Sequence, residues 1–190
     1  MEFITCTLTL PDKTKDLKTG KYVRNYYKNA SSIKNLISYV LQVNIGGAKY
    51  VGCRNIRYGT VKQIVKDIKQ IQELYGKDNG RRMYQYILSF QLSPTEENAK
   101  KLSFIAEYII DTYFKGTQII YGVHTNKNNL HVHFVFSAVL LNGYKWNCRG
   151  KDFHKLKKAI ELDACISMND ESYEYRNGKW YQKYNLEELL

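Results

Sequence analysis

Two segments in the first half of the chain carry apolar residues at helical spacing. In the first, Ser31 or Ser32 can cap a helix. Its apolar residues then follow at positions i, i+3, i+4 and i+7, and they are Ile33, Leu36, Ile37 and Val40. The second predicted helix covers residues 60–75, with one apolar stripe formed by Val61, Ile64, Val65, Ile68 and Ile71. A glycine-containing break at residues 44–50 separates the two helices.

The second half of the chain contains two further helix signals. Ser93 fits an N-cap, Pro94 fits the first helical position and Glu96 fits the third. This helix is expected to run to about Phe114, and the glycine that follows two residues later ends it. A fourth, basic helix is predicted over residues 152–166.

Other segments alternate apolar and polar residues, or run continuously apolar, as is typical of β-strands. Residues 130–140 are nearly continuous in apolar residues, which predicts a central strand. A polar turn at residues 125–129 joins this strand to the preceding one as a hairpin. Residues 11–29 are polar and turn-rich and are predicted to form a loop. The predicted strands are residues 3–10, 83–92, 117–124, 130–140 and, after the tight-turn signal Asn142-Gly143, residues 144–147.

This order of elements predicts an α+β fold, with a central antiparallel sheet of about five strands flanked by helices. The chain has 190 residues, a length that predicts a single domain, 1–190. Residues 168–190 are rich in tyrosine and tryptophan but weakly patterned, so they are expected to be a C-terminal extension. Within it, Asn177 and Gly178 favour a small hairpin.

The charge balance narrows the class of partner. Lysine and arginine number 29 against 18 acidic residues, giving a net charge of +11, which favours a polyanion such as nucleic acid. No run of about 18 apolar residues exists, so no membrane insertion is expected. Residues 1–10 lack the basic start and the cleavage site of a signal peptide. The four cysteines show no metal-binding spacing and are expected to be reduced thiols.

Three of the four histidines lie within ten residues of one another. His131 and His133 are two apart in a predicted strand, so their side chains share one face of the sheet. His124 ends the preceding strand, and the turn folds it back opposite His131. Neutral imidazoles suit divalent transition metals, and three of them leave coordination positions open for substrate and water. The sequence therefore predicts a three-histidine metal site.

The spacing of a histidine, six residues and His-x-His before an apolar strand resembles the third motif of MobA-type relaxases, which mobilise conjugative plasmids and transposons. The stretches 142–146 and 151–156 are also similar to this family. Residues 33–40 resemble its first motif, which carries the nucleophilic tyrosine, and residues 50–53 resemble a short segment that follows. The likeness covers most of residues 30–165. Two features depart from the family: Asn126 stands where many members have an acidic residue, and a long C-terminal region is missing, which indicates a shortened or a compact variant.

The resemblance implies the HUH nuclease architecture and a relaxase activity. Such an enzyme nicks single-stranded DNA at an origin of transfer and forms a 5′-phosphotyrosyl intermediate with a free 3′-hydroxyl. It implies Mg²⁺ or Mn²⁺ in use, although three imidazoles by affinity favour manganese, zinc, cobalt or nickel. Accessory relaxosome proteins and a bacterial cytoplasmic location are expected as well.

Tyr39 is the first candidate for the nucleophile, because it lies just off the apolar stripe of the first predicted helix. Tyr22, Tyr26 and Tyr27 remain alternatives, since the N-terminal loop could also reach the cleft. A phenol is mostly protonated at neutral pH, so a nearby cation would help it to attack. Packing within the helix is the competing role for Tyr39.

Several basic and aromatic residues are candidate DNA contacts. The basic ones are expected to bind phosphates, and Trp146 could stack on bases of single-stranded DNA. Solvated helix faces and ordinary packing are the competing roles. The candidates are Arg81, Arg82, Lys145, Trp146, Arg149, Lys151, Lys155, Lys157 and Lys158.

Two other functions compete with the relaxase. An HUH replication initiator or single-strand transposase shares the histidines, but such proteins generally place the tyrosine after them, whereas Tyr39 precedes them here. A non-catalytic nucleic-acid-binding module with an RRM-like sheet needs no clustered imidazoles, and the chain lacks its aromatic signature.

Overall fold

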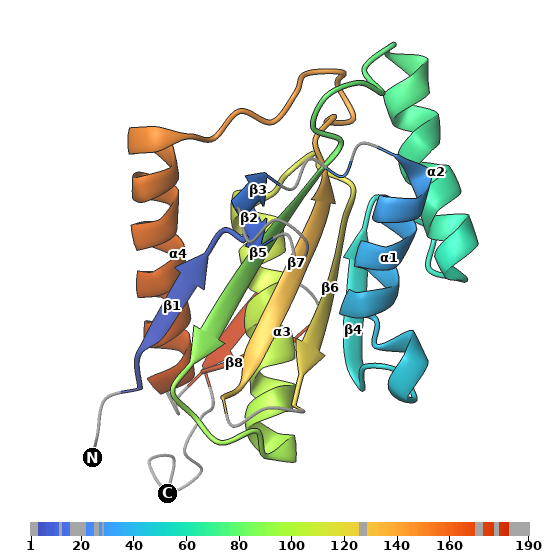
Figure 1. The fold of residues 1–190 in the computed structure, drawn as a ribbon. Coiled ribbons are helices and arrows are strands. Elements are labelled where there is room, and N and C mark those ends of the chain that lie inside the picture. Colours follow the sequence, from blue (N-terminus) through green and yellow to red (C-terminus); the bar gives the residue numbers. More distant parts are fainter. Residues whose placement is uncertain are drawn as a thin grey trace, which may run out of the picture.

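The computed structural model describes residues 4–11, 13–15, 22–24, 27, 29–125, 129–169, 173–176 and 179–182. Its centre is a five-stranded sheet in which all neighbouring strands are antiparallel (Figure 1). The order across the sheet is β1 (Cys6–Thr9), β5 (Met83–Phe90), β7 (His131–Ser137), β6 (Ile119–His124) and β4 (Tyr50–Arg54). The predicted α+β class is therefore confirmed, and β7 takes the central place that its apolar sequence predicts.

In the described part of the chain, four helices cover the sheet, two on each face. α1 (Ala30–Val40) and α2 (Val61–Leu74) pack on one face, and α3 (Glu96–Tyr113) and α4 (Gly150–Asn169) on the other (Figure 1). Alternation along β7 separates the two cores. Val132, Phe134 and Phe136 join the α3–α4 core, while Val135 joins the α1–α2 core with the histidines on its side. Among the described residues, no helix has the length and apolar character needed to cross a bilayer.

The starts of α1 and α3 differ from the sequence prediction. α1 is capped by Asn29, whose side chain accepts a hydrogen bond from the Ser32 backbone at 2.8 Å, so Ser32 lies inside the helix as the partner in a capping box. α3 is capped by Thr95, whose hydroxyl accepts from the Asn98 backbone at 3.2 Å. Ser93 is not the cap. In both cases a second capping residue lies two or three positions away, and the sequence alone does not rank them.

The edge strand β4 was not expected from the sequence. It pairs with β6 over its whole length, and Gly52 within it faces the Tyr121 ring closely, such that a Cβ would lie 2.4 Å from a ring carbon. The strand predicted at residues 144–147 is wrong, because only an isolated bridge between Val139 and Lys145 forms there. The sheet thus has the expected number of strands, but a different fifth member.

Short strands also lie where a loop was predicted. β2 (Lys13–Lys15) and β3 (Tyr22–Arg24) form an antiparallel pair, so the loop prediction for residues 11–29 is wrong for these six residues. A strand of three residues is too short for an alternation of apolar and polar residues to predict it. The pair β8 (Tyr173–Arg176) and β9 (Lys179–Gln182) confirms the C-terminal hairpin. A 3₁₀ turn, η1 (Val43–Ile45), occupies the predicted glycine-containing break.

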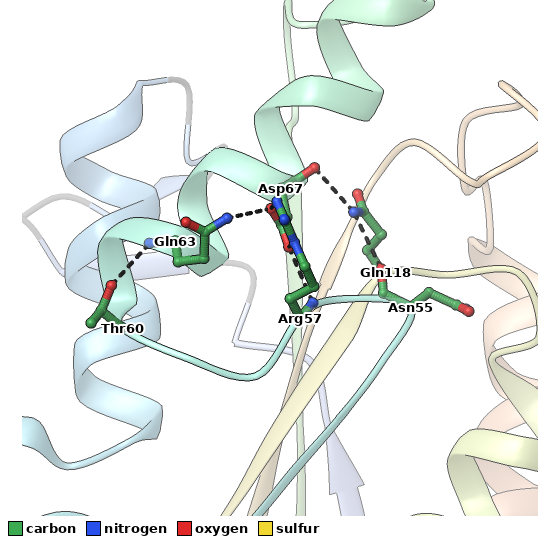
Figure 2. Close-up of polar contacts among 6 residues, drawn as sticks. All are labelled: Asn55, Arg57, Thr60, Gln63, Asp67 and Gln118. Atoms are coloured by element: carbon green, nitrogen blue, oxygen red, sulfur yellow. Dashed lines mark hydrogen bonds and ion pairs between the residues drawn. The ribbon is translucent and has the colours of Figure 1, made fainter.

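A polar cluster fixes the connection from β4 to α2 (Figure 2). The Arg57 guanidinium donates to Asp67 on α2 at 2.7 and 3.2 Å, and the Arg57 backbone donates to the same carboxylate at 3.1 Å. Gln63 donates to Asp67 as well, while Thr60 caps the helix by accepting from the Gln63 backbone. Gln118, just before β6, donates to the backbone carbonyl of Asp67. These contacts anchor α2 to the loop and to the start of β6.

The outer edge of β1 is covered by side chains of α4. Asn169 both donates to and accepts from the backbone of Ile4, at 2.8 and 2.9 Å. Glu161 accepts from the Leu8 backbone nitrogen, and Lys157 donates to the Leu8 carbonyl. An edge strand exposes hydrogen-bonding groups that invite pairing with another chain. The helix therefore takes the place of a sixth strand and closes this edge.

Candidate metal centre

The hairpin β6–β7 brings the three histidines together as predicted. His124 is directly opposite His131 in the ladder, and His133 follows on the same face. The ring centroids of His124 and His133 are 4.4 Å apart, and each lies 5.3 or 5.1 Å from that of His131. One ring nitrogen from each lies within 4.8 Å of the others, and all three side chains are buried.

Fixed partners set the orientation of two of the rings. His124 Nε2 lies 2.8 Å from the carbonyl oxygen of Val40, and His131 Nδ1 lies 2.9 Å from that of Asn129. A carbonyl only accepts, so these two nitrogens carry the protons. The lone pairs are therefore on Nδ1 of His124 and Nε2 of His131. Metal-binding histidines usually donate their other ring N–H in this way, and the donor set fits a divalent transition metal.

The end of α1 approaches the sheet at a glycine. A Cβ at Gly122 of β6 would lie 2.3 Å from the carbonyl oxygen of Val40, so only glycine admits the helix backbone here. That same carbonyl is the partner of His124. Gly122 is directly opposite His133 in the ladder. The close approach thus allows α1 to contact the histidine cluster.

Tyr39, one residue before Val40, lies against the cluster. Its ring centroid is 5.5 Å from that of His124 and 5.2 Å from that of His133, in edge-on contacts. The side chain is 51% exposed, so its ring is accessible from solvent. Tyr39, His131 and His133 line a cleft of about 600 Å³. The first-choice nucleophile and two of the predicted ligands therefore share one open cleft.

The alternative tyrosines have different positions. Tyr27 is half-buried, packs against the α1–α2 core, and its hydroxyl donates to Gln85 Oε1 at 3.3 Å. Tyr22 lies in β3, where only the backbone is described, and Tyr26 lies outside the described residues. Asn126, in the turn between His124 and His131, also lies outside them.

Three polar residues at the site were missed by sequence reasoning. Ser89 is directly opposite His131 in the β5–β7 ladder, and it lines the cleft together with Thr9 of β1. Gln85 of β5 is buried and its Nε2 lies 2.9 Å from His133 Nδ1. The alternation of residues 83–90 places Gln85 and Ser89 on one face of their strand. Only the strand order, which the sequence does not give, places that face beside the histidines.

Four of the predicted DNA contacts gather around a second hollow at the opposite end of β5. Arg81, Lys145, Trp146 and Arg149 line a cleft of about 500 Å³ together with Tyr84. The Arg81 guanidinium lies over the Tyr84 ring at 4.7 Å. On α4, three further predicted contacts are exposed: Lys151, Lys155 and Lys158.

Arg82, Lys157 and Trp146, the last of which also lines the hollow, have partners within the fold. Arg82 is buried, and its Nε donates to Gln72 at 2.7 Å. Lys157 donates to the Leu8 carbonyl on β1. The Trp146 ring stacks on Phe114 of the α3–α4 core, with centroids 5.5 Å apart. These side chains hold the fold together at the positions where DNA contacts were expected.

A known protein family matches the part of the chain that contains this site. The sequence pattern of the family described as "Relaxase: MobA/VirD2-like, nuclease domain" matches residues 39–162, which is more than half of the chain and includes Tyr39 and all three histidines. The chain therefore belongs to the MobA/VirD2-like relaxase family, and the matched part is its nuclease domain.

A curated relative and a solved structure were also found. The relative is Protein rlx of Staphylococcus aureus, which is 34% identical over 114 residues. The match covers 57% of this chain but only 34% of that protein, so the chain spans about a third of its length. The solved chain comes from work titled "Molecular Basis of Vancomycin Resistance Transfer in Staphylococcus aureus". It superposes with a TM-score of 0.43 at 11% identity, over 91% of this chain and 96% of that one, a score too low to establish a common fold.

Proposed function

We propose that this domain nicks single-stranded DNA at an origin of transfer, with Tyr39 as the nucleophile and with His124, His131 and His133 holding a divalent metal ion. The observation that carries this proposal is the edge-on contact of the Tyr39 ring with two of the three histidines at the wall of one open cleft. Membership of the relaxase family supports the same reaction class.

The three histidines would hold Mg²⁺ or Mn²⁺ and leave positions open for phosphate and water oxygens. When bound, such an ion neutralises charge that develops on the phosphate oxygens and favours ionisation of a nearby phenol. Imidazole ligands favour manganese over magnesium by affinity, because magnesium prefers oxygen ligands.

In the proposed step, the Tyr39 hydroxyl loses its proton and its oxygen attacks the scissile phosphorus. The bond from phosphorus to the 3′ oxygen breaks, and that oxygen takes up a proton to become a free 3′-hydroxyl. The fragment downstream of the nick stays linked to Tyr39 through its 5′ phosphate, as a phosphotyrosyl ester. Since one phosphodiester replaces another, the reverse step can rejoin a strand. Tyr39 lies in the last turn of α1, and this fixed place in a helix supplies the positioning that such an attack requires.

The rest of the DNA would contact the basic hollow at the other end of β5. Arg81, Lys145 and Arg149 line this hollow, and the lysines in the first turns of α4 are exposed. Contacts of this kind bind phosphates without reading sequence. Single-stranded DNA bound at this hollow would lie at the end of β5 opposite to the cleft.

The test is formation of a covalent adduct. The protein is incubated with Mn²⁺ and labelled single-stranded oligonucleotides that tile an origin of transfer, and the products are separated under denaturing conditions. The proposal expects a protein–DNA adduct and an equal amount of a shorter fragment ending in a 3′-hydroxyl. A protein that binds these oligonucleotides but yields neither product across the whole origin would refute the nicking activity.

A further inference from the structure

Gln85 contacts His133, the third histidine of the cluster, from the neighbouring strand. It lies on β5, next to β7, and its Nε2 is 2.9 Å from Nδ1 of His133. The side chain is buried at 8% exposure, and its other end, Oε1, accepts from the Tyr27 hydroxyl at 3.3 Å. A chain of three polar groups therefore runs from Tyr27 through Gln85 to the ring of His133.

The two ends of the amide determine which nitrogen of His133 can bind an ion. If the amide NH₂ donates to Nδ1, the ring proton is on Nε2 and Nε2 has no lone pair to give. If the amide is rotated by half a turn, Nδ1–H donates to Oε1 and the lone pair is on Nε2. The amide ends are nearly identical in shape, so rotation costs no packing. Binding of an ion at Nε2 therefore selects the second arrangement.

Tyr27 can serve both arrangements. Its hydroxyl donates to Oε1 in the first, and it accepts from the amide NH₂ in the second, because a phenol oxygen has both capacities. Its backbone has φ of +45°, in the left-handed region that residues with a side chain rarely occupy. A strained backbone that delivers a hydroxyl to a buried amide is consistent with a supporting role for that side chain.

We propose that Gln85 is a positioning residue that sets the tautomer of His133 for metal binding, with the Tyr27 hydroxyl as its partner. The other two histidines are held by backbone carbonyls. His133 is thus the ligand whose tautomer depends on a side chain. This inference rests on the proposed function, because it takes the three histidines to be metal ligands.

The test compares two substitutions of similar size. Gln85→Met keeps the volume of the side chain but removes its hydrogen bonds, and Gln85→Glu keeps an acceptor that can only receive Nδ1–H. The affinity for Co²⁺ is measured by its absorption spectrum, without DNA. We expect Gln85→Met to weaken binding about 10- to 100-fold, the usual effect of removing such a partner. Gln85→Glu should bind at least as tightly as the native protein, and Tyr27→Phe should lose less than Gln85→Met.

Native affinity in Gln85→Met, or equal losses in the Met and Glu variants, would mean that Gln85 only fills space. A loss in Tyr27→Phe greater than that in Gln85→Met would show that Tyr27 acts by another route. A nitrogen NMR spectrum of the histidine rings in the native protein with Zn²⁺ tests the tautomer without any variant. It should show that the proton of His133 is on Nδ1. A proton on Nε2 of His133 would overturn the proposal. A native protein that binds no ion would instead refute the proposed function.

Discussion

The backbone carbonyl of Val40 lies 2.8 Å from Nε2 of His124, so the last turn of α1 is hydrogen-bonded to the histidine cluster. The residue before it is Tyr39, whose ring contacts the same histidine. This hydrogen bond holds both the His124 ring and the end of the helix, so the proposed nucleophile Tyr39 and the proposed ligand His124 keep a fixed relation. This coupling depends on Gly122, where the helix backbone approaches the sheet.

Gly122→Ala should disturb this arrangement. The added Cβ would lie 2.3 Å from the Val40 carbonyl oxygen, and backbone cannot yield as a flexible side chain does. Overpacking of this kind costs about 1–3 kcal/mol of unfolding free energy. We expect that loss in denaturant unfolding, together with weaker Mn²⁺ binding. Gly59→Ala is the matched control, because its Cβ would make only ordinary contacts, at 3.8 Å, and it should change stability by less than about 0.5 kcal/mol. Equal effects at both positions would show that the close approach has no special role.

Tyr39→Phe should abolish the covalent adduct and leave Mn²⁺ and DNA binding near native levels, because only the hydroxyl is removed. Tyr27→Phe should still form the adduct, since the Tyr27 hydroxyl is held at Gln85. Peptide mapping by mass spectrometry identifies the modified residue. An adduct that persists in Tyr39→Phe and is lost in Tyr27→Phe would reverse the assignment.

Removing Arg81 and Arg149 together should weaken binding of long single-stranded DNA without regard to its sequence. Each phosphate contact that is lost reduces the magnitude of the negative slope of log affinity against log salt by about 0.7 for a single strand. Affinity is measured over a range of salt concentrations. A matched double variant, Lys62→Ala with Lys66→Ala on α2, removes the same charge away from the hollow and should change the slope less. Identical slopes for the two double variants would argue against a defined path for the DNA.

The ion pair of Arg57 and Asp67 should make the free energy of unfolding depend on pH in the acidic range. The Arg57 guanidinium holds the pKa of Asp67 at about 2, below its ordinary 3.8. A carboxylate whose pKa is lowered by folding stabilises the fold above its ordinary pKa, and this contribution is lost as the pH falls toward the folded value. Asp67→Asn should therefore be less stable than native at neutral pH, and the gap should narrow as the pH falls from about 4 to about 2. A gap that is constant with pH would mean that the pair contributes through shape alone.

The histidine cluster was predictable from the sequence because it depends on two local rules. Alternation places His131 and His133 on one face of a strand, and a short turn folds His124 back beside them. The observed register, with His124 opposite His131, confirms that reasoning. The position of α1 was predictable as well, since its apolar stripe must face the sheet.

What the sequence could not show depends on strand order and close approach. Gln85 and Ser89 join the site only because β5 lies next to β7, and no local pattern states that pairing. β4 has no clear strand pattern in the sequence, because it is only five residues long and Gly52 interrupts it. The tight-turn signal before residue 144 was real, but the segment after it makes a single bridge instead of a strand.

The central claim is that three imidazoles from one hairpin hold one divalent ion beside Tyr39. Calorimetric titration of the native domain with Mn²⁺, and of the His124→Ala, His131→Ala and His133→Ala variants, tests it most directly. We predict one ion per native chain and a large loss of affinity in each variant, with the native fold retained by circular dichroism. Binding that survives removal of any of these histidines, or a folded native domain that takes up no ion, would contradict the account.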